Sequence, residues 1–144
     1  MIEYTCSLEE IDSGSISLVG GKAANLGELT RAKLPVPHAF CINTRAYQRL
    51  IEVNSLHAPI LGALAGLDYD DPVEIDRRAK IIRDMIIAAD TPADIVNAIR
   101  DAYGQLESEL GNEVLVSVRS SATAEDLPGM SFAGQQDTFL NIHG

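Results

Sequence analysis

A clear helix signal lies in the middle of the chain, at Asp71 and Pro72. Aspartate suits the position just before a helix and proline suits the first position within it, so a helix is predicted to begin at Pro72. Apolar residues then recur at intervals of 4, 3 and 4, which places them on one face of that helix. They are Ile75, Ala79, Ile82 and Ile86.

A second helix is predicted after Thr91 and Pro92, which repeat the same signals. Its apolar stripe ends before Gly111, a residue type that commonly terminates helices. The stripe consists of Ile95, Ile99, Ala102, Leu106 and Leu110. Because two amphipathic helices must bury their apolar faces, we expect them to pack on a sheet.

Short apolar segments supply the candidate strands for that sheet. Glu113–Val118 is short and rich in β-branched residues, as a buried strand should be. Ala39–Asn43 and Asp137–Ile142 are two further candidates. One more helix is predicted over Ala23–Ala32, before prolines that break it, and another begins near Thr44, which can cap it. The chain therefore combines helices with a small sheet.

Length and charge narrow the class of protein. The chain has 144 residues and 46% hydrophobic content, which suit one ordinary globular domain. Its 21 acidic and 11 basic side chains give a formal net charge of -10, which repels a polyphosphate backbone. Nucleic acid is therefore a poor candidate partner. A single nucleotide is still possible, since it needs only one or two well-placed cations.

The cysteines and the N-terminus indicate the compartment. Cys6 and Cys41 belong to no CxxC motif or Cys/His cluster, so we expect two idle thiols in a reducing environment rather than a zinc site or a disulfide framework. The first residues carry acid where a signal peptide carries base, and no apolar run approaches the roughly 18 to 20 residues of a membrane span. We expect a cytoplasmic protein without a membrane partner.

Gly20, Gly21 and Lys22 stand directly before a predicted helix. Glycines allow a ligand to approach the backbone closely, and a cation at a helix N-terminus suits a phosphate group. The segment is not a Walker A loop, because Ile16 stands where that motif needs glycine and Ala23 where it needs serine or threonine. A plain turn carrying a solvated lysine is the alternative interpretation.

Arg119 ends a strand candidate and leads into a loop rich in hydroxyl groups. The planar guanidinium of arginine suits a pair of phosphate oxygens. Alternatively, Arg119 pairs with Glu125 or Asp126 and the hydroxyl groups make local turns. Small residues also surround an apolar pair in the segment 129–138, which suits a loop that closes over phosphates through backbone N–H groups. Its alternative is a β-connection whose Phe132 fills the core.

No other polar residue indicates a nucleophile or a metal site. The histidines lack the glycine-, serine- or threonine-rich context of a phosphate carrier, and they are His38, His57 and His143. Asp68, Asp70 and Asp71 suggest a metal only weakly, because Asp71 is better used as a helix cap.

The order and spacing of these segments are similar to one known family. The matching segments are Val19–Leu29, Pro35–Pro37 with Phe40, Val118–Pro128 and Ser131–Thr138. They resemble the N-terminal nucleotide-binding domain of phosphoenolpyruvate synthase, pyruvate phosphate dikinase and rifampicin phosphotransferase. The resemblance covers nearly all of residues 1–144, and the stretch from Asn54 to Gly111 is its least diagnostic part.

This resemblance implies a fold and a site. The fold is α+β, the N-terminal subdomain of an ATP-grasp fold, with a small, mostly antiparallel sheet packed with helices. Lys22 and Arg119 are implied to hold the phosphates of ATP, and Gly134 and Thr138 to contact the nucleotide. The ligands of Mg²⁺, the second half of the ATP-grasp fold, the phosphohistidine domain and the acceptor domain are all expected outside residues 1–144.

The resemblance also implies an activity for the complete enzyme. The β-phosphate of ATP passes through a histidine on another domain to an acceptor such as pyruvate, giving AMP and phosphate. An antibiotic-modifying enzyme similar to rifampicin phosphotransferase is one alternative, and a non-catalytic nucleotide- or partner-binding module is an alternative of another class. We expect no catalytic residue among residues 1–144, so that the chain alone is not a catalyst.

Overall fold

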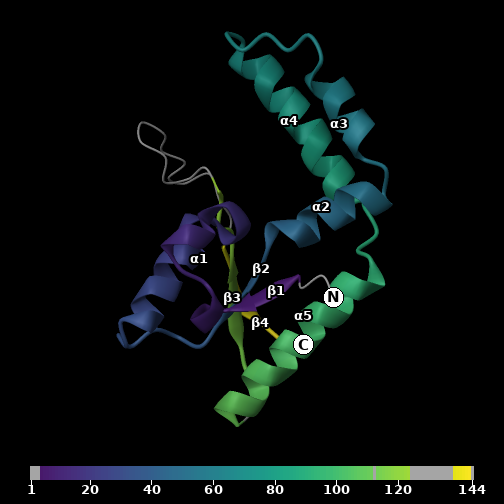
Figure 1. Ribbon diagram of the computed structural model, residues 1–144. Helices are drawn as coiled ribbons and strands as arrows, with labels where there is room; N and C mark the ends of the chain where they lie inside the picture. The colour runs from purple at the N-terminus through teal and green to yellow at the C-terminus, as the bar shows by residue number, and fades with distance from the viewer. Residues whose placement is uncertain (1–3, 112, 124–137, 144) are drawn as a thin grey trace. The chain divides into compact units, whose positions relative to one another are not determined.

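A computed structural model describes residues 4–111, 113–123 and 138–143 of the chain. The chain divides into two compact units, Met1–Ala46 with Asp94–Gly144, and Tyr47–Ala93, and each is described by itself (Figure 1). In the described residues there are five α-helices and two small antiparallel sheets. The predicted α+β class is thus confirmed, although the single small sheet is replaced by two separate strand pairs.

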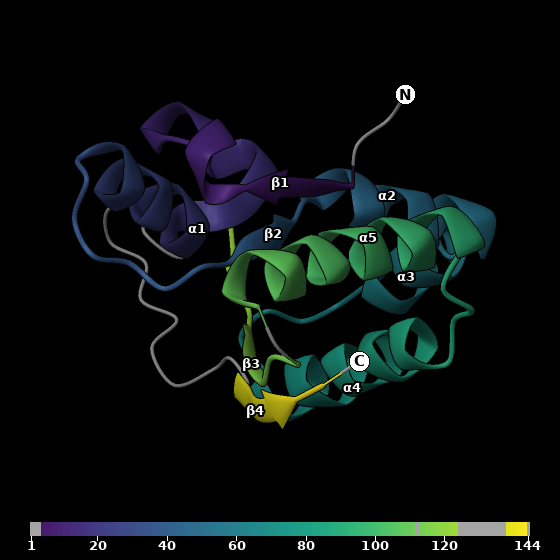
Figure 2. The ribbon, with the colours of Figure 1, turned by 90° about the horizontal axis from the view of Figure 1, so that it is seen from below.

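The first unit is organised around strands β1 (Thr5–Ser7) and β2 (Phe40–Ile42). The two strands pair antiparallel, with Cys6 opposite Cys41. Helix α1 (Ile16–Arg31) lies against this pair, as Figures 1 and 2 show. Two short 3-10 helices, η1 (Leu8–Glu10) and η2 (Ser13–Ser15), connect β1 to α1. The buried core between these elements consists of Leu8, Ile11, Val19, Ala23 and Ala24.

Helix α1 is longer than the predicted Ala23–Ala32 segment. It begins at Ile16, because a first helical turn buries Val19 in the core. The helix then kinks at Gly20, whose φ of 79° and ψ of 166° are open essentially only to glycine. The part of α1 that carries Lys22 therefore starts anew at Gly21.

The second sheet of this unit consists of β3 (Val116–Arg119) and β4 (Thr138–Ile142). The strands pair antiparallel with a shift in register between Val116 and Val118. The prediction of a buried strand here is wrong: Val118 is 46% exposed and Phe139 of β4 is 58% exposed. A β-branched composition favours the extended conformation, but burial depends on which tertiary neighbours cover the strand.

Helix α5 (Ala93–Leu110) confirms the second predicted helix. Its stripe residues Ile95 and Leu106 are buried, and the phenol of Tyr4 donates a hydrogen bond of 3.2 Å to Asp94. The helix ends as predicted at Gly111, which has a φ of 78° and donates its N–H to the carbonyl of Glu107 over 2.8 Å.

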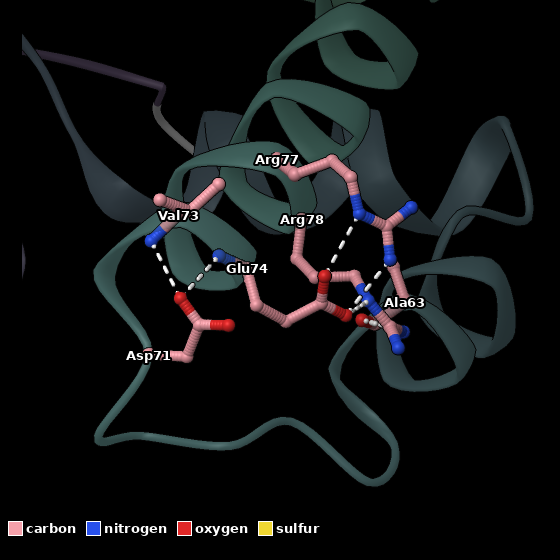
Figure 3. Close-up of polar contacts among 6 residues, drawn as sticks. All are labelled: Ala63, Asp71, Val73, Glu74, Arg77 and Arg78. Atoms are coloured by element: carbon pink, nitrogen blue, oxygen red, sulfur yellow. Dashed lines mark hydrogen bonds and ion pairs between the residues drawn. The ribbon is translucent and has the colours of Figure 1, made fainter.

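All the regular secondary structure of residues 47–93 is helical. It consists of most of α2 (Thr44–Val53), α3 (His57–Leu64) and α4 (Pro72–Ile87). The predicted cap of α4 is confirmed, since a carboxylate oxygen of Asp71 accepts the N–H groups of Val73 at 3.0 Å and Glu74 at 3.3 Å (Figure 3). The expectation that the α4 stripe packs on a sheet is wrong, because α4 packs against α3.

One arginine joins these two helices. The guanidinium of Arg78 donates to the Glu74 carboxylate over 2.7 Å and to the carbonyl of Ala63 in α3 over 2.8 Å (Figure 3). The predicted cap of α2 needs a correction. The side chain of the buried Asn43, rather than that of Thr44, accepts the N–H of Arg45 at 3.0 Å. None of the helices in the described ranges is long and apolar enough to span a bilayer.

Candidate nucleotide-binding site

The start of the second segment of α1 is bonded to the residues that follow β3. The N–H of Gly21 donates to the carbonyl of Ala122 over 3.2 Å, and the N–H of Ala23 donates to the hydroxyl of Ser121 over 3.2 Å. The ammonium of Lys22, between them, donates to the carbonyl of Ser120 over 3.4 Å. Residues 21–23 are thus hydrogen-bonded to residues 120–122, about 98 positions further along the chain.

The role of Gly20 differs from the one predicted. We expected the glycine to let a ligand approach the backbone, but the space beside its Cα is filled by protein. A Cβ at this position would lie 2.4 Å from the carbonyl oxygen and 2.5 Å from the hydroxyl oxygen of Ser121. Glycine is required at position 20 because residues 120–123, called here the loop after β3, pack directly on the backbone of Gly20.

Protein acceptors also use two of the N–H groups at this helix start. Unpaired N–H groups at a helix N-terminus would attract an anion, but those of Gly21 and Ala23 are bonded to Ala122 and Ser121. The positively charged group that the segment offers to a phosphate is the Lys22 ammonium. Lys22 is half-buried, and its ammonium makes an exposed hydrogen bond to Ser120.

Arg119 and Thr138 meet at the adjacent end of the second sheet. They are directly opposite partners in the β3–β4 register, and both are exposed. Arg119 immediately precedes Ser120, the residue that accepts the Lys22 hydrogen bond. The structure therefore brings together three of the four residues predicted to bind nucleotide. The fourth, Gly134, lies outside the described residues.

The alternatives for Arg119 and the following loop fall partly outside the described residues as well. These include its pairing with Glu125 or Asp126 and the packing of Phe132. Sequence reasoning missed the role of Ser121, which receives the helix start. The hydroxyl-rich character of the loop was visible, but nothing local indicated that one hydroxyl group serves a helix 98 residues earlier.

The two cysteines lie closer together than their positions in the sequence indicate. They are opposite each other in β1 and β2, and both thiols contact the core beneath α1. Burial, together with the nearby Cys6 thiol, raises the pKa of the Cys41 thiol to about 11. Both are free thiols, and at neutral pH Cys41 behaves as a small apolar side chain.

His38 and Asp71, considered above as possible functional residues, make contacts of a structural kind. His38 lies 3.4 Å from the Glu109 carboxylate on the surface, and Asp71 serves as the helix cap. Within residues 4–111, 113–123 and 138–143, no three acidic, cysteine or histidine side chains are grouped as metal ligands would be.

Comparison with known proteins identifies the family. The sequence profile of the pyruvate phosphate dikinase AMP/ATP-binding domain matches residues 16–144. The chain belongs to this family. The match includes both segments that form the contact between α1 and the loop after β3, so the site described above lies within an AMP/ATP-binding domain of a phosphotransferase family.

Relatives of this AMP/ATP-binding domain carry two names. The chain is 43% identical, over its whole length, to a probable phosphoenolpyruvate synthase of Methanothermobacter thermautotrophicus, of which it covers 21%. It is 44% identical over its whole length to the rifampicin phosphotransferase of Bacillus subtilis and to the phosphoenolpyruvate synthase of Pseudomonas aeruginosa, covering 16% and 19% of them. The chain thus spans about a fifth or less of these relatives.

Proposed function

We propose that this chain is the N-terminal subdomain of an ATP-grasp fold and binds ATP through Lys22 and Arg119, with Gly134 and Thr138 as further nucleotide contacts. The observation that carries the proposal is the convergence of Lys22, Arg119 and Thr138 from three segments of the chain. Membership of the AMP/ATP-binding domain family supports the choice of ligand.

The chemistry of the two cations suits a polyphosphate. Lysine supplies a compact charge and arginine a planar fork that can hold two phosphate oxygens. The chain as a whole carries a formal charge of -10 and repels an anion, so local cations must overcome that field. Lys22, which bonds to Ser120, and Arg119, which precedes Ser120 in the chain, are the cations proposed to do so.

We further propose that the complete enzyme is a dikinase-type phosphotransferase. It passes the β-phosphate of ATP to a histidine on another domain and then to pyruvate, while water accepts the γ-phosphoryl group, so that AMP and phosphate are released. Phosphoryl transfer of this kind needs chiefly positioning and neutralisation of charge. Mg²⁺, when bound, would neutralise part of the phosphate charge, and we propose that its protein ligands lie outside residues 1–144. An antibiotic hydroxyl is the alternative acceptor, since relatives named rifampicin phosphotransferase are about equally similar.

Calorimetric titration of the 144-residue chain with MgATP tests the proposal. Lys22→Ala and Arg119→Ala should each weaken binding about 10- to 100-fold, the loss expected for a hydrogen bond to a charged group. Matched controls are Lys80→Ala and Arg100→Ala, which remove the same charges from helices α4 and α5 and should leave the affinity unchanged.

Two results would contradict the proposal. One is a folded chain that releases no heat with MgATP, and the other is an affinity that falls equally in the site variants and the controls. The second result would mean that net charge alone governs binding. To distinguish the acceptors, a full-length enzyme containing this domain is assayed for AMP production with pyruvate and with rifampicin.

A further inference from the structure

Ser121 is an uncharged residue in the contact between α1 and the loop after β3. We propose that Ser121 is a positioning residue, which holds the Lys22-bearing end of α1 against the Arg119-bearing end of β3. This inference rests on the proposed function, because the two cations that Ser121 aligns are those proposed to hold the phosphates of ATP.

Ser121 acts as a helix cap supplied from a distant part of the chain. An ordinary cap is the side chain just before the helix, which accepts an N–H group of the first turn. That place is taken here by Gly20, which has no side chain. The Ser121 hydroxyl instead accepts the Ala23 N–H from 98 residues away, and the neighbouring Ala122 carbonyl accepts the Gly21 N–H.

The distance between the two cations depends on this cap. Lys22 lies between the two residues whose N–H groups are accepted, and Arg119 stands two residues before Ser121. Three hydrogen bonds join the two segments that carry these cations, and of the three the one from Ala23 to Ser121 uses a side-chain acceptor. The alternative covalent path runs through almost a hundred residues and sets no useful distance.

Gly20 makes the close approach possible. The carbonyl and hydroxyl oxygens of Ser121 occupy the space that a Cβ of residue 20 would fill, at 2.4 and 2.5 Å. Any side chain at position 20 would move the loop, and Arg119 with it, away from Lys22. Gly20 and Ser121 thus form a matched pair, in which one residue provides space and the other provides the hydrogen bond.

The variant that tests this role is Ser121→Ala, which removes the hydroxyl and leaves every backbone acceptor in place. It should weaken MgATP binding by the 144-residue chain about 5- to 20-fold, as the loss of a helix cap and of the alignment that it maintains. Ser121→Thr keeps a hydroxyl and should recover part of the affinity. Thr123→Ala, which removes an exposed hydroxyl two residues further on, is the matched control and should change nothing.

A double-mutant cycle separates positioning from simple loss of stability. If Ser121 acts by placing Lys22, then Ser121→Ala should not weaken binding further in a chain that already carries Lys22→Ala. Its effect on the urea unfolding midpoint should instead be the same with and without Lys22. Fully additive losses of affinity would overturn the proposal and leave Ser121 with a structural role only.

Amide hydrogen exchange tests the cap without any nucleotide. Ser121→Ala should speed exchange of the Ala23 N–H, whereas Thr123→Ala should not; an unchanged Ala23 rate overturns the cap. The two proposals fail in different ways. An unsubstituted chain that binds no MgATP refutes the proposed function and the positioning that depends on it. An affinity that weakens with Lys22→Ala but not with Ser121→Ala refutes the positioning alone.

Discussion

Replacing Gly27 by alanine should destabilise the protein, although the same change usually stabilises a helix. Gly27 is buried inside α1, where alanine is ordinarily favoured over glycine by about 1 kcal/mol. Here a Cβ would lie 2.3 Å from the carbonyl oxygen and 2.8 Å from the Cγ1 atom of Ile11. Ile11 is only 2% exposed, so it has little room to move aside.

The expected size follows from these two opposing effects. Overpacking of this kind costs about 1 to 3 kcal/mol, and the middle of that range exceeds the gain of about 1 kcal/mol in helix propensity. We expect Gly27→Ala to lower the free energy of unfolding by about 1 kcal/mol, with about 2 kcal/mol as the upper end of the range. Gly104→Ala is the matched control, because it lies in α5 of the same unit and its Cβ would meet nothing within 4 Å. That variant should gain about 0.5 to 1 kcal/mol.

Urea unfolding followed by circular dichroism at 222 nm measures both variants against the parent chain. The two variants are expected to shift the unfolding midpoint in opposite directions. If Gly27→Ala and Gly104→Ala both raise the unfolding midpoint, the contact between Ile11 and α1 is not as close as described. Close packing would then not require glycine at position 27.

Two further predictions concern titratable groups. Hydrogen bonds from Arg77 and Arg78 lower the pKa of the Glu74 carboxyl from 4.5 to about 2, so its stabilising contribution is present above pH 4.5 and is lost as the pH falls through 2. Glu74→Gln should therefore lower the urea unfolding midpoint at pH 7. Between pH 5 and pH 2 this midpoint should fall less in Glu74→Gln than in the parent chain; equal falls would contradict this. Burial raises the pKa of Cys41 to about 11, so iodoacetamide should alkylate it far more slowly in the native chain at pH 8 than in urea, as peptide mass spectrometry can follow. Equal rates in the two conditions would mean that the thiol is accessible.

The features that sequence reasoning predicted correctly depend on near neighbours in the chain. The cap at Asp71 needs only the N–H groups of Val73 and Glu74, and the stop at Gly111 needs only the carbonyl of Glu107. Such signals are complete within a few residues. A helix boundary can therefore be read from the residues on either side of it.

The features that were missed depend on residues far apart in the sequence. Strand β1 has three residues and no apolar alternation of its own, and it exists because β2 pairs with it. The position of Cys6 directly opposite Cys41 follows from that register and could not be predicted from their spacing in the sequence. The exposure of Val118 was misjudged for the same reason, because a residue's burial is decided by tertiary neighbours.

The candidate site combines both kinds of information. The resemblance to a family supplied Lys22 and Arg119 as phosphate ligands, but it did not indicate how the two are held together. That arrangement depends on Gly20 and Ser121, through a contact whose two sides are about a hundred residues apart in the sequence. Within the Gly20–Gly21–Lys22 segment the roles are therefore divided. Gly20 is an architectural requirement set by Ser121, Gly21 donates its N–H to Ala122, and Lys22 alone supplies charge. A chain that kept Lys22 but replaced Gly20 would retain the positive charge. It would lose the close contact with Ser121 that is proposed to hold this charge near Arg119.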